Sequence, residues 1–190
     1  METLSKLFGS EAKVKVMRLF LFNPETVFSA VDISERAKEE ISKARREVNL
    51  LAKTGLIRQK SAKGRPGYIL NSQFGYLVPL QNFLINVEPL KPAEIIRRLG
   101  KLGPMKLIIT SGVFIQDKES RVDLLVVGDH IKKASLENVI KTLEAEIGKE
   151  LRYAYFTTED FKYRLSMFDK LIRDILDYPH RKILNKIGLL

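Results

Sequence analysis

The segment 42–70 constrains the fold more than any other part of the chain, because a helix, its stop and two strands follow one another within it. Apolar side chains recur at helical spacing up to Lys53, and Ser42 is a suitable N-cap for that helix. Gly55 then stops it, in the left-handed position that commonly ends helices. Residues 56–60 alternate apolar and polar, YIL returns as a second strand, and SAKGRPG between them is a basic turn. The segment therefore predicts a helix followed by a two-stranded hairpin.

Positive charge is concentrated in the same segment. The whole chain carries a formal net charge of +10 at pH 7 and has a pI of about 9.7. Residues 43–65 contain a single acid, Glu47, and the following cations: Lys43, Arg45, Arg46, Lys53, Arg58, Lys60, Lys63 and Arg65. A surplus focused in this way favours a polyanionic partner, and we expect nucleic acid before a membrane surface.

Two further helices are predicted ahead of this segment. One spans 10–22, with Ser10 as N-cap and Asn23-Pro24 at its end, and the other spans roughly 30–38. Three helices followed by a basic hairpin is the order of elements in a winged helix-turn-helix. The phrase EVNLLAKTGLIRQKSAKGRPGYIL resembles the L..L...GLI......GR...Y.L stretch of winged-helix transcription regulators. The resemblance implies that helix 42–53 enters the major groove of double-stranded DNA and that residues 60–67 act as a basic wing.

The predicted helix 42–53 separates an apolar from a polar face. Its apolar face consists of Ile41, Ala44, Val48 and Leu51. Arg46 and Asn49, on the polar face, have side chains that pair with guanine and adenine edges. We expect DNA contacts from Ser42, Lys43, Arg46, Asn49, Lys53, Lys60, Lys63 and Arg65, the last three to phosphates, with a narrow minor groove as the alternative for Arg65. A solvated basic face without a partner and docking to another protein remain as alternatives.

A connector is predicted over residues 74–102, between a first domain at 1–73 and a second at 103–190. Residues 76–85 are apolar enough for a helix with Pro79 in its first turn, and KPAEIIRRLGKLG predicts another short helix. The connector is either a spacer between the domains or a dimerisation element, since winged-helix regulators usually bind paired half-sites as homodimers.

The second half predicts a small layer of strands and helices. MKLIITSGVFI at 105–115 and SRVDLLVVGD at 120–129 have the composition of buried strands, and ELRYAYFT at 150–157 predicts a third. A helix is predicted at 135–148, with Ser135 as its cap and Gly148 as its stop, and another runs up to Tyr178, where Pro179 breaks it. The fold class expected for the whole chain is therefore α+β or α/β with two domains.

The string LIITSGVFIQDKESRVDLLVVGD resembles the opening strands of minimal nucleotidyltransferase domains of the DNA polymerase β-like superfamily, and the tail ELRYAYFTTEDFKYRLSMFDKLIRDILDYPHRKIL is similar to theirs. The resemblance implies a small mixed sheet with helices, in which a Gly-Ser turn holds nucleotide phosphates and two aspartates hold magnesium. In this sequence Thr110-Ser111 stands at the Gly-Ser position, Arg121 replaces the first aspartate and Asp123 matches the second. Arg121 and Asp123 lie on one face of a strand, so we expect Arg121 to pair with Asp123 or with another acid.

These substitutions predict a degenerate nucleotide site at Thr110, Ser111, Arg121 and Asp123, with no catalytic residues, metal or cofactor. The second domain then serves as a ligand pocket for a nucleotide or as a module for assembly with a protein partner. An active or residual nucleotidyltransferase and an antitoxin-like interaction module are the alternatives. We expect a cytoplasmic protein that does not enter the membrane, because the chain has no cysteine and no uninterrupted apolar run of a secretory signal or membrane span.

Overall fold

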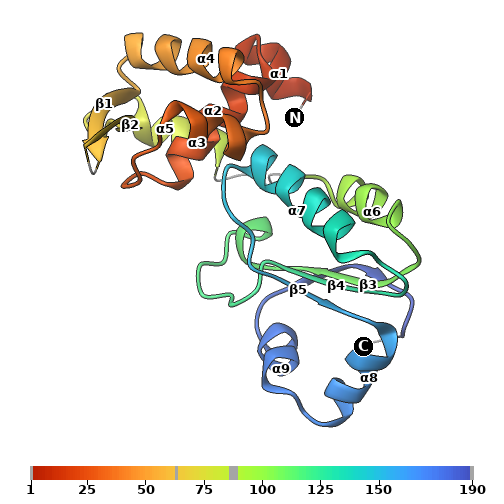
Figure 1. Cartoon of the computed structure of the whole chain (residues 1–190). Helices are drawn as coiled ribbons and strands as arrows, with labels where there is room; N and C mark the ends of the chain where they lie inside the picture. The colour runs from red at the N-terminus through yellow and green to blue at the C-terminus, as the bar shows by residue number, and fades with distance from the viewer. Residues whose placement is uncertain (1, 63, 86–89, 189–190) are drawn as a thin grey trace. The chain divides into compact units, whose positions relative to one another are not determined.

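The structure is a computed structural model that describes residues 2–62, 64–85 and 90–188. It is mixed α and β, with helices and two separate sheets (Figure 1). The chain divides into two compact units, the first formed by residues 1–87 with 141–150 and the second by 88–140 with 151–190. The predicted connector 74–102 is thus divided between the units. In the part of the chain described, no helix has both the length and the apolar character needed to cross a bilayer.

The first unit contains a group of helices followed by a hairpin and a further helix. Its elements are α1 (Glu2–Phe8), α2 (Glu11–Phe22), α3 (Ala30–Ala37), α4 (Ile41–Lys53), β1 (Ile57–Ala62), β2 (Arg65–Leu70) and α5 (Leu77–Leu84). The core of the unit is built on α2, in which Val16, Phe20 and Leu21 are buried against apolar side chains of α3, α4 and the hairpin. The helices predicted at 10–22, 30–38, 42–53 and 76–85 are confirmed within a residue or two, whereas α1 is not predicted by the sequence.

Local signals explain most of the helix boundaries in this unit. The side chain of Ser10 caps α2 as predicted, accepting a hydrogen bond from the Lys13 N–H at 3.2 Å. Gly55 follows α4 with φ of 81°, the left-handed conformation expected at a helix end. The prediction of Ser42 as the N-cap is wrong, because α4 begins at Ile41 after Glu40 and Ser42 lies inside its first turn. Ile41, predicted on the apolar face of this helix, is exposed rather than buried, because it is the first residue of α4 and only Ala44, Val48 and Leu51 of that face reach the core.

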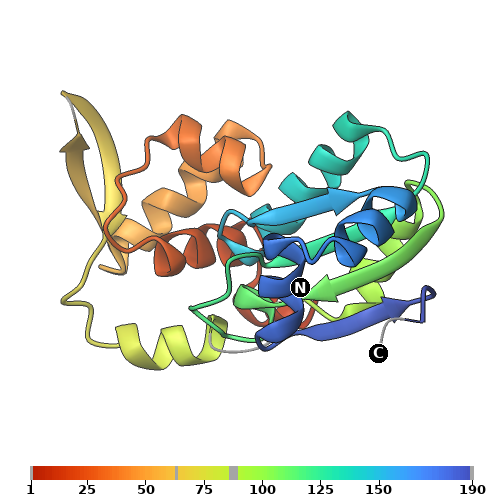
Figure 2. The same cartoon turned by 90° about the horizontal axis from the view of Figure 1, so that it is seen from below.

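The hairpin is antiparallel and is fixed to the helices by one bridge. Its register runs from Ile57 opposite Leu70 to Ala62 opposite Arg65. Phe28, just ahead of α3, exchanges two backbone hydrogen bonds of 2.9 Å with Tyr68 of β2. A side chain at Gly67 would approach Val27 Cγ1 to 2.7 Å, so only glycine allows this close approach. The hairpin therefore projects from the helices on a fixed base (Figures 1 and 2).

The second unit is a four-stranded sheet with helices on both faces (Figures 1 and 2). Its elements are α6 (Pro92–Gly100), β3 (Met105–Thr110), the 3-10 turn η1 (Gly112–Phe114), β4 (Leu124–Gly128), α7 (Lys133–Ile147, of which the last part belongs to the first unit), β5 (Tyr153–Phe156), α8 (Thr158–Ser166), α9 (Lys170–Asp177) and β6 (Arg181–Asn185). The strand order is β5-β4-β3-β6, with only β4 and β5 parallel. All five residues of β4 are buried, as expected for a central strand covered on both faces.

The sequence predicts these strands and helices but misplaces several boundaries. The strand expected over 105–115 ends at Thr110 and turns into η1, and α7 starts at Lys133 ahead of the predicted cap Ser135. The single helix predicted up to Tyr178 is two helices, because Phe168 adopts φ of 55° and Asp169 then caps α9 through the N–H groups of Leu171 and Ile172. Strand β6, beyond Pro179, is not predicted by the sequence.

Candidate nucleic-acid interface and the strand at Asp123

Helix α4 presents its predicted contact residues to solvent, together with the exposed apolar side chains of Ile41 and Leu50. Ala44, Val48 and Leu51 are buried in the core of the first unit. The residues predicted to contact DNA from this helix are all exposed: Ser42, Lys43, Arg46, Asn49 and Lys53. The structure therefore places these five side chains on the accessible side of one rigid element.

The arginines of α4 and the hairpin differ from the other arginines in having no partner among the residues that the structure describes. The structure gives Arg45, Arg46, Arg58 and Arg65 no ion pair or hydrogen bond with any other described residue. Each of the other arginines has at least one interaction with another residue, among them Arg98 with Glu94, Arg121 with Asp174 and Arg164 with Asp169. Four guanidinium groups with no partner in the described part of the chain thus lie between residues 45 and 65, where they remain available to an external anion.

The only acid of the 43–65 segment does not offset these charges at the surface. Glu47 is 7% exposed and lies toward α2, where its Oε2 is 4.0 Å from Nζ of Lys13. The outward face of α4 therefore keeps its full positive charge. Lys43, on this face, has an acidic neighbour in Glu39, whose carboxylate lies 4.0 Å from its Nζ.

The hairpin adds cations from one of its faces. Residues directly opposite in an antiparallel pair share a face. Because Ala62 lies opposite Arg65 and Lys60 opposite Gly67, the side chains of Arg58, Lys60 and Arg65 project on the same face. All three are exposed. Lys63, which we predict to contact phosphate, lies outside the described residues.

Two of these cations are absent from the predicted contact set. Arg45 and Arg58 are exposed and without a partner among the described residues, yet sequence reasoning counts them only toward the net charge. The sequence signal that could have identified them is their position next to predicted contact residues in α4 and β1. Arg45 precedes Arg46 on the helix, and Arg58 stands two residues before Lys60 on the strand.

Asp123, which we expected to match the second metal-binding aspartate, is fully buried and is hydrogen-bonded within the second unit. Its Oδ1 accepts from the Val113 N–H at 3.0 Å, and its Oδ2 accepts from the backbone N–H of Arg152 at 2.9 Å. The guanidinium of Arg152 completes the set, with Nε 3.2 Å from Oδ2. A metal ion would have to displace this guanidinium to reach the carboxylate.

The turn after β3 packs directly on Asp123. Gly112 has φ of 54°, and a side chain there would overlap the carboxylate of Asp123. The Ser111 hydroxyl donates to the carbonyl of Val122, and the Thr110 hydroxyl donates to the carbonyl of Arg181 at 3.4 Å. The polar groups of the predicted nucleotide site thus have partners within the unit.

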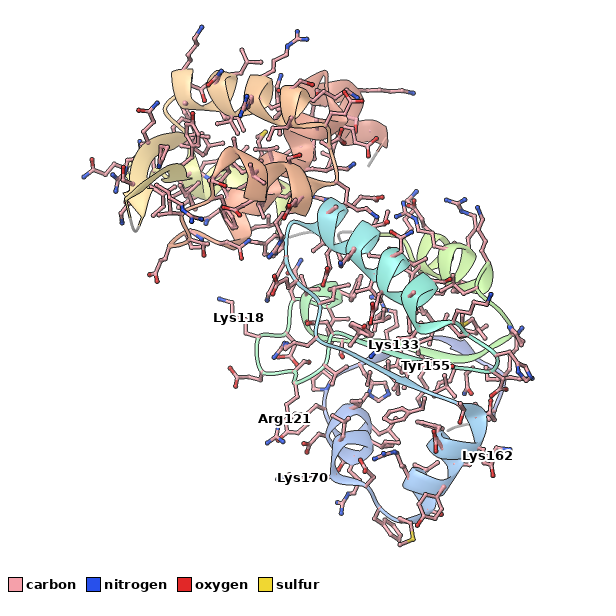
Figure 3. The ribbon with its side chains drawn as sticks, viewed as in Figure 1. Lys118, Arg121, Lys133, Tyr155, Lys162 and Lys170 are labelled. Atoms are coloured by element: carbon pink, nitrogen blue, oxygen red, sulfur yellow. The ribbon has the colours of Figure 1, made fainter. Side chains whose placement is uncertain are left out.

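Arg121 pairs with another acid and not with Asp123, the first of the two partners expected from the sequence. Its guanidinium lies 2.7 Å from Oδ2 of Asp174 on α9, and Figure 3 shows its side chain beside that helix. The hollow lined by Ser111, Ser120, Arg121 and Asp174 has a cavity volume of about 10 Å³. This is room for about one water molecule, whereas small-molecule sites usually occupy about 300 Å³ or more. Within residues 2–62, 64–85 and 90–188, no three His, Cys, Asp or Glu side chains come close enough together to hold a metal ion.

Comparison of the chain with protein-family models, with curated protein sequences and with solved structures found no match.

Proposed function

We propose that the chain is a DNA-binding transcriptional regulator, with a winged helix-turn-helix in its first unit and a catalytically inert, nucleotidyltransferase-like second unit. One observation carries the proposal: the arginines without a partner among the described residues, Arg45, Arg46, Arg58 and Arg65, all lie on α4 and the hairpin. Unpaired guanidinium groups on a rigid surface favour phosphate and guanine as ligands.

In this proposal α4 lies in the major groove. A helix with its side chains is about 10–12 Å across, which fits the major groove of about 12 Å width. The 13 residues of α4 extend for about 20 Å. Arg46 and Asn49 read base edges from the middle of the helix, while Ser42, Lys43 and Lys53 contact the backbone near its ends. The hairpin then acts as the wing, and Arg58, Lys60 and Arg65 bind phosphates flanking the groove.

The second unit has a structural or regulatory role in the proposal rather than a catalytic one. The carboxylate of Asp123 accepts hydrogen bonds from Val113 and Arg152, and the guanidinium of Arg121 forms an ion pair with Asp174. Nothing in these contacts favours nucleotidyl transfer, and we do not propose it. The unit is the candidate for assembly with a protein partner or for a ligand that changes DNA affinity.

The proposal is tested by selecting bound duplexes from a random pool with the full chain. We expect a sequence motif to be enriched over successive rounds, and we expect the enrichment to disappear with the pair Arg46→Ala/Asn49→Ala. A pair of the same side-chain types away from this surface, Arg173→Ala/Asn185→Ala, is the control and should enrich the same motif. No retention of any duplex at low salt would contradict the proposal.

A further inference from the structure

A pocket with a volume of about 300 Å³ lies in the first unit, between the turn that joins α1 to α2 and one flank of α4 (Figure 1). Its charged lining consists of Lys13 from α2 and of Lys43, Arg46 and Glu47 from α4, and Leu50 adds an apolar side chain. We call it the α2–α4 pocket. Its volume falls at the lower end of the range for small-molecule sites, so it has room for a small compound.

The α2–α4 pocket contains a buried carboxylate that lacks a hydrogen bond. Glu47 is 7% exposed, and its Oε2 has no hydrogen-bond donor among the described residues. The Nζ of Lys13 is 4.0 Å from this oxygen and donates instead to the carbonyl of Phe8, at 3.1 Å. A buried acceptor without a donor is costly to the folded chain. Because Glu47 lines the pocket, a ligand with a hydroxyl or amino group would supply the missing donor.

The charge of the lining indicates the rest of the ligand. Three cations and one acid give the pocket a net charge of about +2. Arg46 has no partner among the described residues, and Glu39, the acid 4.0 Å from Lys43, is already held by Lys15 at 2.8 Å. A phosphate monoester carries a charge of about −1.5 to −2 at pH 7, whereas a carboxylate or a phosphodiester carries only one. A guanidinium group also matches phosphate geometrically, through two parallel hydrogen bonds.

Two other hollows of the described residues are less suited to a charged ligand. The hollow on the hairpin beside Gln59 and Tyr68 has a volume of about 130 Å³ and one charged residue in its lining. The hollow between α3 and residues 141–150 has about 270 Å³, but its three cations are balanced by three acids. One of these cations, Arg36, already pairs with Glu150. The α2–α4 pocket therefore combines space, net charge and an unsatisfied acceptor.

We propose that the α2–α4 pocket binds a small phosphate monoester of the sugar phosphate class. Its phosphate lies on Lys13, Lys43 and Arg46, and one of its hydroxyl groups donates to Glu47. The effect on DNA rests on the proposed function, in which Arg46 reads a base edge. A guanidinium that binds the ligand's phosphate is no longer available to a base, so the ligand competes with the duplex.

The first test measures ligand binding to the full chain without DNA, by isothermal titration calorimetry with ribose 5-phosphate, inorganic phosphate and ribose. We expect ribose 5-phosphate to bind at least about tenfold more tightly than inorganic phosphate, because a hydroxyl group reaches a charged acceptor. Ribose alone should not bind measurably. Equal affinities for ribose 5-phosphate and inorganic phosphate, or no binding of either, would overturn the proposal.

Two variants assign the binding to this pocket. Glu47→Gln should remove the preference for ribose 5-phosphate and leave inorganic phosphate bound at least as tightly, because a negative charge is lost from the lining. Lys13→Gln should weaken ribose 5-phosphate by about tenfold, and Lys162→Gln in the second unit, which removes the same charge, should leave it unchanged. Equal weakening by the two lysine variants would show general charge attraction and overturn the site. Thermal unfolding should confirm that all three variants fold.

The second test titrates a bound duplex with ribose 5-phosphate and follows its release by fluorescence anisotropy, with sodium chloride at equal ionic strength as the control. We expect release as the pocket saturates, and about tenfold more ligand should be needed with Lys13→Gln, since Lys13 is not among the predicted DNA contacts. A duplex retained at saturating ligand would overturn the competition. Failure of DNA binding itself is a separate result, because the calorimetry decides the pocket without DNA.

Discussion

The carboxylate of Asp123 is fully buried and lies against the backbone N–H and the guanidinium of Arg152, with contacts of 2.9 and 3.2 Å to its Oδ2. Asp123 ends the segment before β4, and Arg152 stands just before β5, so the pair ties together the starts of two parallel neighbours. An aspartate that resembles a metal ligand in the sequence thus has a structural partner 29 residues away.

Replacing Asp123 should destabilise the second unit. In Asp123→Asn the guanidinium of Arg152 loses its counter-ion. In addition, the amide NH₂ replaces one carboxylate oxygen and then faces the backbone N–H of Val113 or Arg152 without an acceptor. We expect a loss of about 2–3 kcal/mol in the free energy of unfolding, measured by urea denaturation of the full chain. Arg121→Ala breaks the more exposed pair with Asp174 and should cost less than about 1 kcal/mol. If Asp123→Asn left stability unchanged or raised it, as at a site of repelling metal ligands, this structural role would be wrong.

Gly112 is required by the same arrangement. Its φ of 54° is unfavourable for any side chain, and a Cβ would overlap the Asp123 carboxylate. Gly112→Ala should therefore cost more than the about 1–2 kcal/mol of left-handed strain alone. Gly9→Ala is the control, because Gly9 has φ of 77° and open space around it. Equal losses in the two variants, measured by thermal or urea unfolding, would show that the contact with Asp123 is loose.

The second unit should lose stability in acid through Asp129. Two hydrogen bonds from Thr158, the backbone N–H at 2.9 Å and the hydroxyl at 2.7 Å, lower the pKa of this carboxyl below its usual value of 3.8. A lowered folded-state pKa gives stability that is fully present above pH 3.8 and is lost as the pH falls through the folded value. We expect Asp129→Asn to be less stable at neutral pH and to show a smaller further loss in acid.

The control for this prediction is Asp160→Asn, which removes the same charge from the first turn of α8 and leaves both Thr158 bonds intact. Urea midpoints between pH 7 and the acid limit measure the difference. Parallel pH profiles for the Asp129→Asn chain and the unmodified chain would contradict the assignment.

Much of the first unit could be predicted from the sequence because its signals are local. Ser10 and Gly55 each mark a helix boundary, and the structure confirms both. SAKGRPG correctly marks the hairpin, but the turn is shorter than predicted, because β1 extends to Ala62 and β2 begins at Arg65. The interaction of Asp123 with Arg152 could not be predicted in this way, because it depends on which strands become neighbours. The break between α8 and α9 at Phe168 could not be predicted either. A bulky residue rarely adopts positive φ, and no glycine marks the end of α8. Strand β6 has only five residues, Arg181–Asn185, so its sequence is too short to show a clear alternation of apolar and polar side chains.

Base reading and phosphate binding should separate in the variants of the first unit. Arg46→Ala or Asn49→Ala should reduce discrimination between matched and mismatched duplexes by about 1–3 kcal/mol each, since bidentate contacts to purine edges would be lost. Lys60→Ala should weaken binding to every duplex by a similar factor. Competition titrations with matched and mismatched duplexes measure both effects, and equal losses on every sequence from all variants would contradict these roles.

The measurement that tests the central proposal most directly is fluorescence anisotropy of the full chain on duplex DNA across a salt series. The variants are Lys60→Ala/Arg65→Ala on the hairpin and Lys118→Ala/Arg173→Ala in the second unit, which remove the same formal charge. We predict affinity that falls steeply with salt and a log–log slope that becomes shallower by about 2 in the hairpin pair only. Absence of binding at low salt, or an equal change of slope in both pairs, would contradict a DNA-binding wing.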